Sequence, residues 1–339
     1  MTKAFICGCL GPSLTDAERV FIASQRPWGL ILFKRNVVDR ANLAALTQDF
    51  RRLVGRADAP VLIDQEGGRV QRMGPPHWEG YVQAARFETL GDDEGPAAAR
   101  LSARLMAFDL AEVGITVDCA PVLDVADEAT HAVIGTRAYS RDPRRVAIFA
   151  RAVCEGLLAG GVAPVVKHMP GHGRGRVDSH LELPTVDASL EELEACDFAP
   201  FRALKDMPIA MTAHIRYMAL DPERPATVSP AVVGGIMRER IGFDGLILSD
   251  DLSMKALGGT MEERVEAVFA AGVDVALHCN GDPGEADVVA AAAPDLRGKA
   301  LARAEAALRR ADHARDGGIN VAEARADLAR HWRKASFSV

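Results

Sequence analysis

Several features that would indicate a membrane, nucleic-acid or disulfide-rich protein are scarce in this 339-residue chain. No apolar run approaches the roughly 20 residues of a membrane-spanning helix. Aromatic residues make up only 5% of the chain, no basic cluster accompanies them, and the net charge is −7, which disfavours nucleic acid or an anionic membrane as partner. The six cysteines are scattered, which argues against a disulfide framework or a zinc ribbon. We therefore expect a soluble, cytoplasmic, monomeric protein with a small-molecule partner.

Short apolar runs alternate with helix-like patterns along most of the chain. The patterns predict strands at 4–9, 29–33, 60–64, within 115–125, and at 162–166, 208–212, 245–249 and 273–277. They predict helices at 15–25, 41–54, 97–113, 144–159, 190–204, 230–241 and 261–271.

Eight strand–helix units with continuous Val, Ile and Leu strands predict a parallel sheet covered by helices. The count favours an α/β fold of the single-domain (β/α)8 TIM-barrel type over an open doubly wound sheet, whose G-x-G-x-x-G signature after a strand is absent. We expect one catalytic domain over 1–339, with 294–339 forming extra C-terminal helices.

Polar and charged residues follow one predicted strand after another. In a barrel of this kind the active site gathers at the carboxyl ends of the strands. The residues placed there are Asp64, Asp124, Lys167, His168, His214, Asp250, Asp251, His278 and Asn280. This is more charge than solubility requires, so we expect a catalytic site at this end.

The densest group of functional side chains lies in 165–184, VVKHMPGHGRGRVDSHLELP. Its glycines and prolines exclude regular structure after the strand. Ordering so many glycines costs conformational entropy, which indicates that the loop has a function. Asp178 and His180 are two residues apart, close enough for a carboxylate to orient an imidazole that acts as general acid and then base. A solvated loop histidine is the alternative.

Other segments carry candidate binding or reacting groups. Asp250 could serve as a nucleophile, a metal ligand or a cap, and Asp251 could cap the following helix. Asp64 and Arg72 could grip vicinal hydroxyls and amide carbonyls, with a surface ion pair as the alternative. Taken alone, Arg137 is an ordinary loop arginine.

Isolated histidines and a metal site are weaker candidates. His77, His214 and His278 are each expected to be structural. A metal site built from His168, His172, Asp178 and His180 is disfavoured, because these groups are irregularly spaced in a glycine-rich loop and zinc prefers rigid ligands.

Taken together, four segments resemble the family 3 glycoside hydrolases, and among them the single-domain bacterial β-N-acetylglucosaminidases. The segments are 64–72 (DQEGGRVQR), 167–173 (KHMPGHG), 178–180 (DSH) and 249–254 (SDDLSM). The resemblance runs from the first predicted strand to the eighth, in the family's order and spacing. Two departures are visible: Met169 replaces a usual Phe, and Arg174-Gly175-Arg176 replaces a common Asp-Thr.

The resemblance implies roles for the matching residues. Asp250 would be the nucleophile, and His180, paired with Asp178, the acid/base. The N-acetylglucosamine ring would be bound by Asp64, Arg72, Arg137, Lys167 and His168. The implied reaction is retaining hydrolysis of N-acetylglucosamine from anhydro-muropeptides during peptidoglycan recycling, without a cofactor or metal.

Three other functions stay open at this point. A glycoside phosphorylase would use the same residues with phosphate as acceptor, and Arg174 and Arg176 could line a basic acceptor pocket. A metal-dependent barrel hydrolase would lose activity to chelators. A non-catalytic sugar-binding protein could keep Asp64, Arg72 and Lys167.

Overall fold

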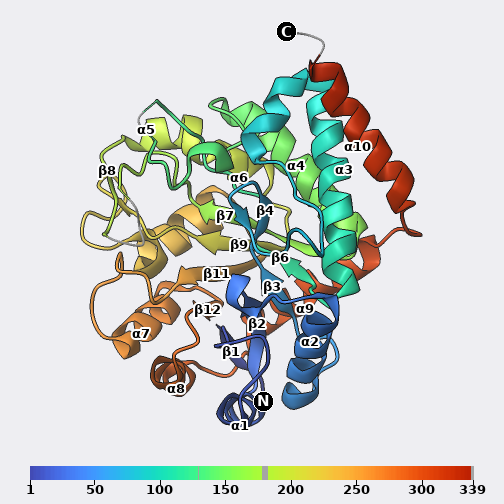
Figure 1. The fold of residues 1–339 in the computed structure, drawn as a ribbon. Helices are drawn as coiled ribbons and strands as arrows, with labels where there is room; N and C mark the ends of the chain where they lie inside the picture. The colour runs from blue at the N-terminus through green and yellow to red at the C-terminus, as the bar shows by residue number, and fades with distance from the viewer. Residues whose placement is uncertain (129, 178–181, 337–339) are drawn as a thin grey trace.

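Eight parallel strands close into a barrel in the computed structural model, which describes residues 1–128, 130–177 and 182–336 (Figure 1). The predicted (β/α)8 fold is therefore confirmed. In spatial order around the barrel the strands are β1 (Lys3–Cys7), β12 (Val275–His278), β11 (Leu246–Asp251), β9 (Ile209–Thr212), β7 (Ala163–Met169), β6 (Val117–Asp118), β3 (Val61–Ile63) and β2 (Pro27–Leu32).

A helix follows each barrel strand, as the alternating pattern predicts. In chain order these helices are α1 (Asp16–Gln25), α2 (Arg40–Val54), α3 (Gly91–Glu112), α4 (Pro143–Ala159), α6 (Ala199–Ala203), η6 (Ala231–Arg240), α7 (Met261–Ala271) and α8 (Pro283–Ala292). Shorter elements lie in the connections: η1 (Lys34–Asn36), β4 (Gln65–Gly67), β5 (Val70–Gln71), η2 (Ala84–Leu90), η3 (Gly135–Arg137), β8 (Thr185–Val186), α5 (Leu190–Glu192), η4 (Leu193–Asp197), β10 (Arg216–Tyr217) and η5 (Ala226–Val228).

Capping residues mark where several helices begin. Thr15 accepts the Glu18 N–H at the start of α1 while the Glu18 carboxylate accepts the Thr15 N–H, and Thr260 with Glu263 does the same for α7. Aspartates cap the first turns of α2, α4 and α8 (Asp39, Asp142 and Asp282).

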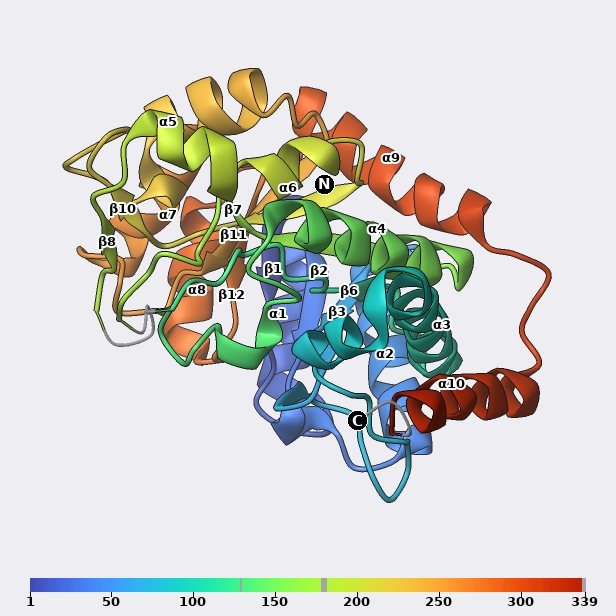
Figure 2. The same ribbon diagram turned by 90° about the horizontal axis from the view of Figure 1, so that it is seen from above.

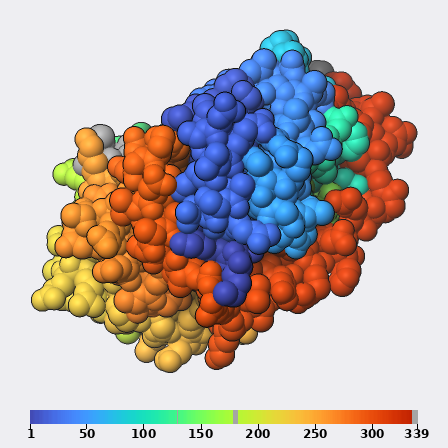
Figure 3. All heavy atoms as spheres, turned by 90° about the horizontal axis from the view of Figure 1, so that it is seen from below, coloured from blue at the N-terminus to red at the C-terminus, as the bar shows by residue number. Residues whose placement is uncertain are grey.

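The first and last strands of the barrel pair with each other and close it. Strand β1 pairs in parallel with β12 through Phe5 and Ala276, and with β2 through Ile6 and Gly29. Figure 3 shows the same closure from below: the dark-blue N-terminal segment lies between the orange C-terminal part and the lighter blue of the next helix. Apolar side chains of the strands fill the barrel interior.

Helices α9 (Gly298–Ala314) and α10 (Val321–Ser336) follow the last unit. Arg303 of α9 pairs with Asp244 and Asp274, which lie just before β11 and β12, so α9 covers the amino ends of these strands. Helix α10 lies alongside α3 (Figures 1 and 2), and its Trp332 ring packs 5.5 Å from that of Phe87 in η2. The assignment of one domain with 294–339 as its extension stays a prediction.

Some predicted boundaries are wrong for local reasons. The fourth strand does lie within 115–125, as expected, but it is regular only at Val117–Asp118, because Pro121 has no N–H for the ladder. Lys167 and His168 lie inside β7 rather than after it. Helix α3 begins at Gly91 instead of 97, and the helix expected at 190–204 is three consecutive segments, the last of them with Pro200 in its first turn.

Candidate active site

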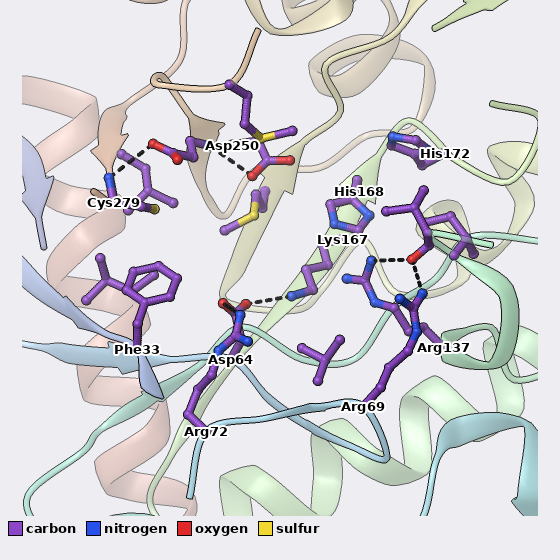
Figure 4. Close-up of a pocket in the computed structure, with 18 residues that line it drawn as sticks. Phe33, Asp64, Arg69, Arg72, Arg137, Lys167, His168, His172, Asp250 and Cys279 are labelled. Atoms are coloured by element: carbon purple, nitrogen blue, oxygen red, sulfur yellow. Dashed lines mark hydrogen bonds and ion pairs between the residues drawn. The ribbon is translucent and has the colours of Figure 1, made fainter. Parts of the chain in front are cut away.

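A pocket of about 210 Å³ opens at the carboxyl ends of the barrel strands (Figure 4). Six of the eight predicted site residues line it, namely Asp64, Arg72, Arg137, Lys167, His168 and Asp250. The other two, Asp178 and His180, lie outside the residues that the structure describes. The remaining lining residues are Ile31, Phe33, Arg69, Val70, Val133, Ile134, His172, Met211, Asp251, Met254, Leu277 and Cys279.

Asp64, at the end of β3, holds two cations from different parts of the chain. Its Oδ1 accepts the Lys167 ammonium at 2.9 Å and its Oδ2 accepts the Arg72 guanidinium at 3.0 Å. Burial opposes ionisation, but Lys167 and Arg72 outweigh it and hold the pKa of Asp64 well below its usual range. Because Lys167 is buried inside the pocket, this is not the surface ion pair considered from the sequence.

The hairpin of β4 and β5 turns Arg72 back toward Asp64. The buried Gln65 side chain spans the hairpin: its Oε1 accepts the N–H groups of Arg72 at 2.9 Å and Met73 at 3.0 Å. The turn residues Gly67 and Gly68 have φ values of 93° and 60°, which L side chains rarely adopt. The Asp64–Arg72 contact is therefore fixed by local backbone geometry.

Glu66 is a site residue that the sequence reasoning missed. It accepts two hydrogen bonds from the Arg137 guanidinium, at 2.8 and 2.7 Å, and pairs with the Lys167 ammonium at 2.8 Å. Burial opposes ionisation, yet Lys167 and Arg137 lower the pKa of Glu66 to about 2. Lys167 is buried, which disfavours its charged form, but the carboxylates of Asp64 and Glu66 raise its pKa.

These contacts join five residues into one surface of alternating charge. We call it the charged wall, and its members are Asp64, Glu66, Arg72, Arg137 and Lys167. Figure 4 shows Asp64, Arg72, Arg137 and Lys167. Directed donors and acceptors in fixed positions suit the hydroxyl and amide groups of a sugar. Glu66 was missed because its partner Arg137 is 71 residues away in the chain, and only its place within the DQEGGR segment pointed to it.

Asp124 orients the predicted binding residue His168. Its Oδ2 lies 2.7 Å from His168 Nδ1, and its Oδ1 accepts the backbone N–H groups of His168 at 3.2 Å and His172 at 2.6 Å. Although burial acts in the opposite direction, the two histidines lower the pKa of Asp124 to about 2. A carboxylate on Nδ1 makes that nitrogen a hydrogen-bond donor and fixes the orientation of the His168 ring.

Asp250 lies across the pocket from the charged wall (Figure 4). Among the described residues, the one hydrogen bond to its carboxylate comes from the Asp251 N–H, at 2.8 Å. Burial disfavours the charged form, but the imidazoles of His214 and His168 and that N–H more than offset burial, so the pKa of Asp250 is lowered. The group is an ionised carboxylate with lone pairs directed at the pocket.

Two neighbours of Asp250 have structural contacts. Asp251 does not cap a helix; its carboxylate accepts the N–H groups of Ser253 at 3.1 Å and Cys279 at 3.0 Å and so ties the turn after β11. The buried His214 ring lies 3.0 Å from the Asp251 carbonyl through Nε2 and 2.7 Å from Thr227 Oγ1 through Nδ1.

Within residues 1–128, 130–177 and 182–336, no group of three or more His, Cys, Asp or Glu side chains is arranged to hold a metal ion. No helix in the same part of the chain is long and apolar enough to cross a membrane.

Comparison with known proteins identifies the family of this pocket. The family model described as the glycosyl hydrolase family 3 N-terminal domain matches residues 11–311. The chain belongs to glycoside hydrolase family 3. It is 41% identical over 289 residues to a β-hexosaminidase of Methylococcus capsulatus, covering 83% of this chain and 84% of that one. A β-hexosaminidase of Pseudomonas aeruginosa is 38% identical over 293 residues and covers 85% of each chain.

Solved structures agree with this assignment. NagZ from Neisseria gonorrhoeae superposes with a TM-score of 0.86 at 32% identity, covering 97% of this chain and 98% of that one. A family 3 β-N-acetylglucosaminidase from Paenibacillus gives a TM-score of 0.83 at 28% identity, and the match spans 94% of this chain but 63% of that longer one. This family 3 protein is thus a glycoside hydrolase, of the β-hexosaminidase type by its curated relatives.

Proposed function

We propose that the protein is a retaining exo-β-N-acetylglucosaminidase that removes terminal N-acetylglucosamine from peptidoglycan fragments. The observation that carries the proposal is the position of Asp250, an ionised carboxylate that faces the charged wall across the pocket. A ring held on the charged wall would present its anomeric carbon to the opposite side, where a nucleophile is needed.

The reaction proceeds in two displacements. Asp250 Oδ attacks the anomeric carbon, and the bond to the leaving oxygen breaks as the His180 imidazolium, paired with Asp178, gives that oxygen a proton. Water then attacks the glycosyl–Asp250 ester while neutral His180 takes up the proton, which regenerates both groups. The roles of Asp178 and His180 rest on the family resemblance alone.

The charged wall supplies ring recognition in this proposal. Asp64 and Arg72 offer an acceptor and a donor to neighbouring hydroxyls, Lys167 adds a donor, and His168 presents Nε2. Arg137 binds the ring from the side of Glu66. Since each cation has a carboxylate partner and each carboxylate a cation, the groups are oriented before substrate arrives.

Arg69, at the mouth of the pocket, supports a peptidoglycan fragment as substrate. Its guanidinium lies against the carbonyl oxygens of Ala132 and Val133, and no carboxylate among the described residues pairs with it. Muropeptides carry carboxylates beyond the scissile bond, and an arginine at the mouth suits such an anion. The muropeptide substrate, a cytoplasmic location and a monomeric state remain proposals.

The phosphorylase alternative rests on Arg174 and Arg176 as an acceptor pocket for phosphate. Arg174 Nε donates to Asp197 at 2.7 Å, and Arg176 donates twice to Asp127, at 2.6 and 2.8 Å. Both charges are thus already matched by carboxylates, which favours water as the acceptor.

The test is release of nitrophenol from 4-nitrophenyl β-N-acetylglucosaminide, with and without EDTA and with added phosphate. Hydrolysis that is indifferent to both additions is expected. Phosphate stimulation with formation of the sugar 1-phosphate would reassign the protein as a phosphorylase, loss of activity in EDTA would reassign it as a metal-dependent hydrolase, and no release would refute the activity.

A further inference from the structure

The loop that follows β7 forms ion pairs with two other segments of the chain. Arg174 Nε donates to Asp197 at 2.7 Å, and the Asp197 side chain at the end of η4 is only 1% exposed. The Arg176 guanidinium forms two hydrogen bonds with Asp127, at 2.6 and 2.8 Å. We call the two contacts Arg174–Asp197 and Arg176–Asp127 the anchor pairs.

The backbone just before Arg174 fits its surroundings closely. A Cβ on Gly173 would lie 1.8 Å from the Val125 carbonyl oxygen, so the strand-end segment and the loop touch through their main chains. Thr130 Oγ1 donates to the Gly173 carbonyl at 2.8 Å, and the Tyr217 hydroxyl donates to that of Gly171. The start of the loop is therefore held by packing and hydrogen bonds at Gly171 and Gly173, and the two anchor pairs follow directly after it.

The anchor pairs come directly before the residues to which the resemblance assigns proton transfer. Arg176 is two residues before Asp178 and four before His180. These arginines are also where this chain departs from the common family sequence, so the family motif does not explain them. An ion pair in which one partner is almost wholly buried is costly to break, because the remaining charge keeps no partner.

We propose that Arg174 and Arg176 are positioning residues: through the anchor pairs they fix residues 174–176, which directly precede the acid/base dyad in the chain. The proposal rests on the proposed glycosidase function. Small displacements of a catalytic group cost on the order of 10²-fold in rate, and the cost falls on the step in which that group acts. For a general acid this is protonation of the leaving group.

The experiment compares Arg174→Gln, Arg176→Gln and the double variant on a series of aryl β-N-acetylglucosaminides. With phenyl as the leaving group, kcat/KM should fall by about 10- to 100-fold in the double variant, whereas a dinitrophenyl leaving group, which needs little protonation, should change by less than about threefold. Arg174→Lys keeps a charge opposite Asp197 and should restore most of the lost activity.

The matched control is Arg238→Gln, which removes a buried arginine–aspartate pair at the opposite end of the barrel. Arg238 pairs with Asp274 and donates to the Gly245 carbonyl at 2.6 Å, far from the pocket. This variant should lower the melting temperature without changing the dependence on the leaving group. Equal losses on phenyl and dinitrophenyl substrates, or wild-type values in the double variant, would overturn the proposal.

A second measurement does not depend on activity. Backbone hydrogen exchange across 170–177 should quicken in the double variant and stay unchanged in Arg238→Gln. Unchanged exchange in this segment would contradict the anchoring. Failure of the wild-type protein to cleave any of the glycosides would refute the proposed function instead, and the exchange result would still decide whether the anchor pairs hold the loop. Arg176 is half exposed, so Arg176→Gln remains informative if changes at Arg174 prevent folding.

Discussion

The two sides of the pocket are built in opposite ways. On the charged wall, three cations and two carboxylates are joined by four ion pairs, and Lys167 contacts both carboxylates. On the facing side, Asp250 receives a single hydrogen bond to its carboxylate from the described residues. The comparison teaches that binding groups are held rigid by each other, while the reacting group keeps its lone pairs for chemistry. Substitutions on the two sides should therefore fail in different ways.

The largest effect is expected on the reacting side. Asp250→Asn keeps the shape but removes the attacking carboxylate, and kcat should fall by about 10⁴-fold or more. KM for the nitrophenyl glycoside should change little, because the charged wall is intact. Steady-state kinetics with a highly purified variant gives both values, and a kcat within tenfold of wild type would remove Asp250 from the mechanism.

The centre of the charged wall should give the next largest effect. Lys167→Met keeps the aliphatic stem but leaves Asp64 and Glu66 without the cation between them, so kcat/KM should fall by about 10²- to 10³-fold. Exposed Lys205→Met is the matched control and should behave as wild type. If both variants kept full activity, the wall would not be the ring-binding surface.

Glu66 should show a smaller effect on catalysis and a distinct one on stability. Glu66→Gln frees Arg137 and Lys167 from one carboxylate, and kcat/KM should fall by about 10- to 100-fold, mainly through KM.

The stability effect of Glu66 follows from its pKa, which is about 2 in the folded protein against an ordinary 4.5. The unfolded chain takes up a proton in that interval and the folded chain does not, so the stabilisation is complete above about pH 4.5 and is lost as the pH falls through 2. Melting temperatures over this range should fall more steeply for wild type than for Glu66→Gln; parallel curves would contradict the assigned ionisation.

The mouth of the pocket should give the smallest effect. Arg69→Gln should lower kcat/KM for a muropeptide by about three- to tenfold, since a partly exposed ion pair contributes modestly. The neutral nitrophenyl glycoside should not respond. Equal losses on the two substrates would show that Arg69 supports the pocket rather than an anionic leaving group.

Much of this architecture could be predicted from the sequence, because its signals are local. Continuous apolar runs such as 245–249 predict buried parallel strands, and a charged residue directly after a run, as at Asp64 and Asp250, must face the carboxyl end of the barrel. The position of Lys167 was harder to predict. It lies within β7 and not after it, because the irregular segment around Pro121 continues beyond β6 and forms a bridge between Val122 and Lys167.

The long-range partners could not be predicted, because no local pattern encodes them. Glu66 meets Arg137 only when β3 and β6 become neighbours, and the anchor pairs join Arg174 and Arg176 to carboxylates 23 and 49 residues away. The sequence leaves Arg174 and Arg176 open as a binding site for phosphate, because a sequence shows charged residues without their partners. The roles of Asp178 and His180 remain predictions from the resemblance.

The most direct test of the account is covalent trapping of the proposed glycosyl–enzyme. The protein would be incubated with a 5-fluoro derivative of N-acetylglucosaminyl fluoride, digested and examined by peptide mass spectrometry. The account predicts one glycosyl unit per chain, attached to Asp250, and no adduct in Asp250→Asn. An adduct on another residue, or steady hydrolysis of nitrophenyl glycoside by a wild-type enzyme that never forms an adduct, would contradict it.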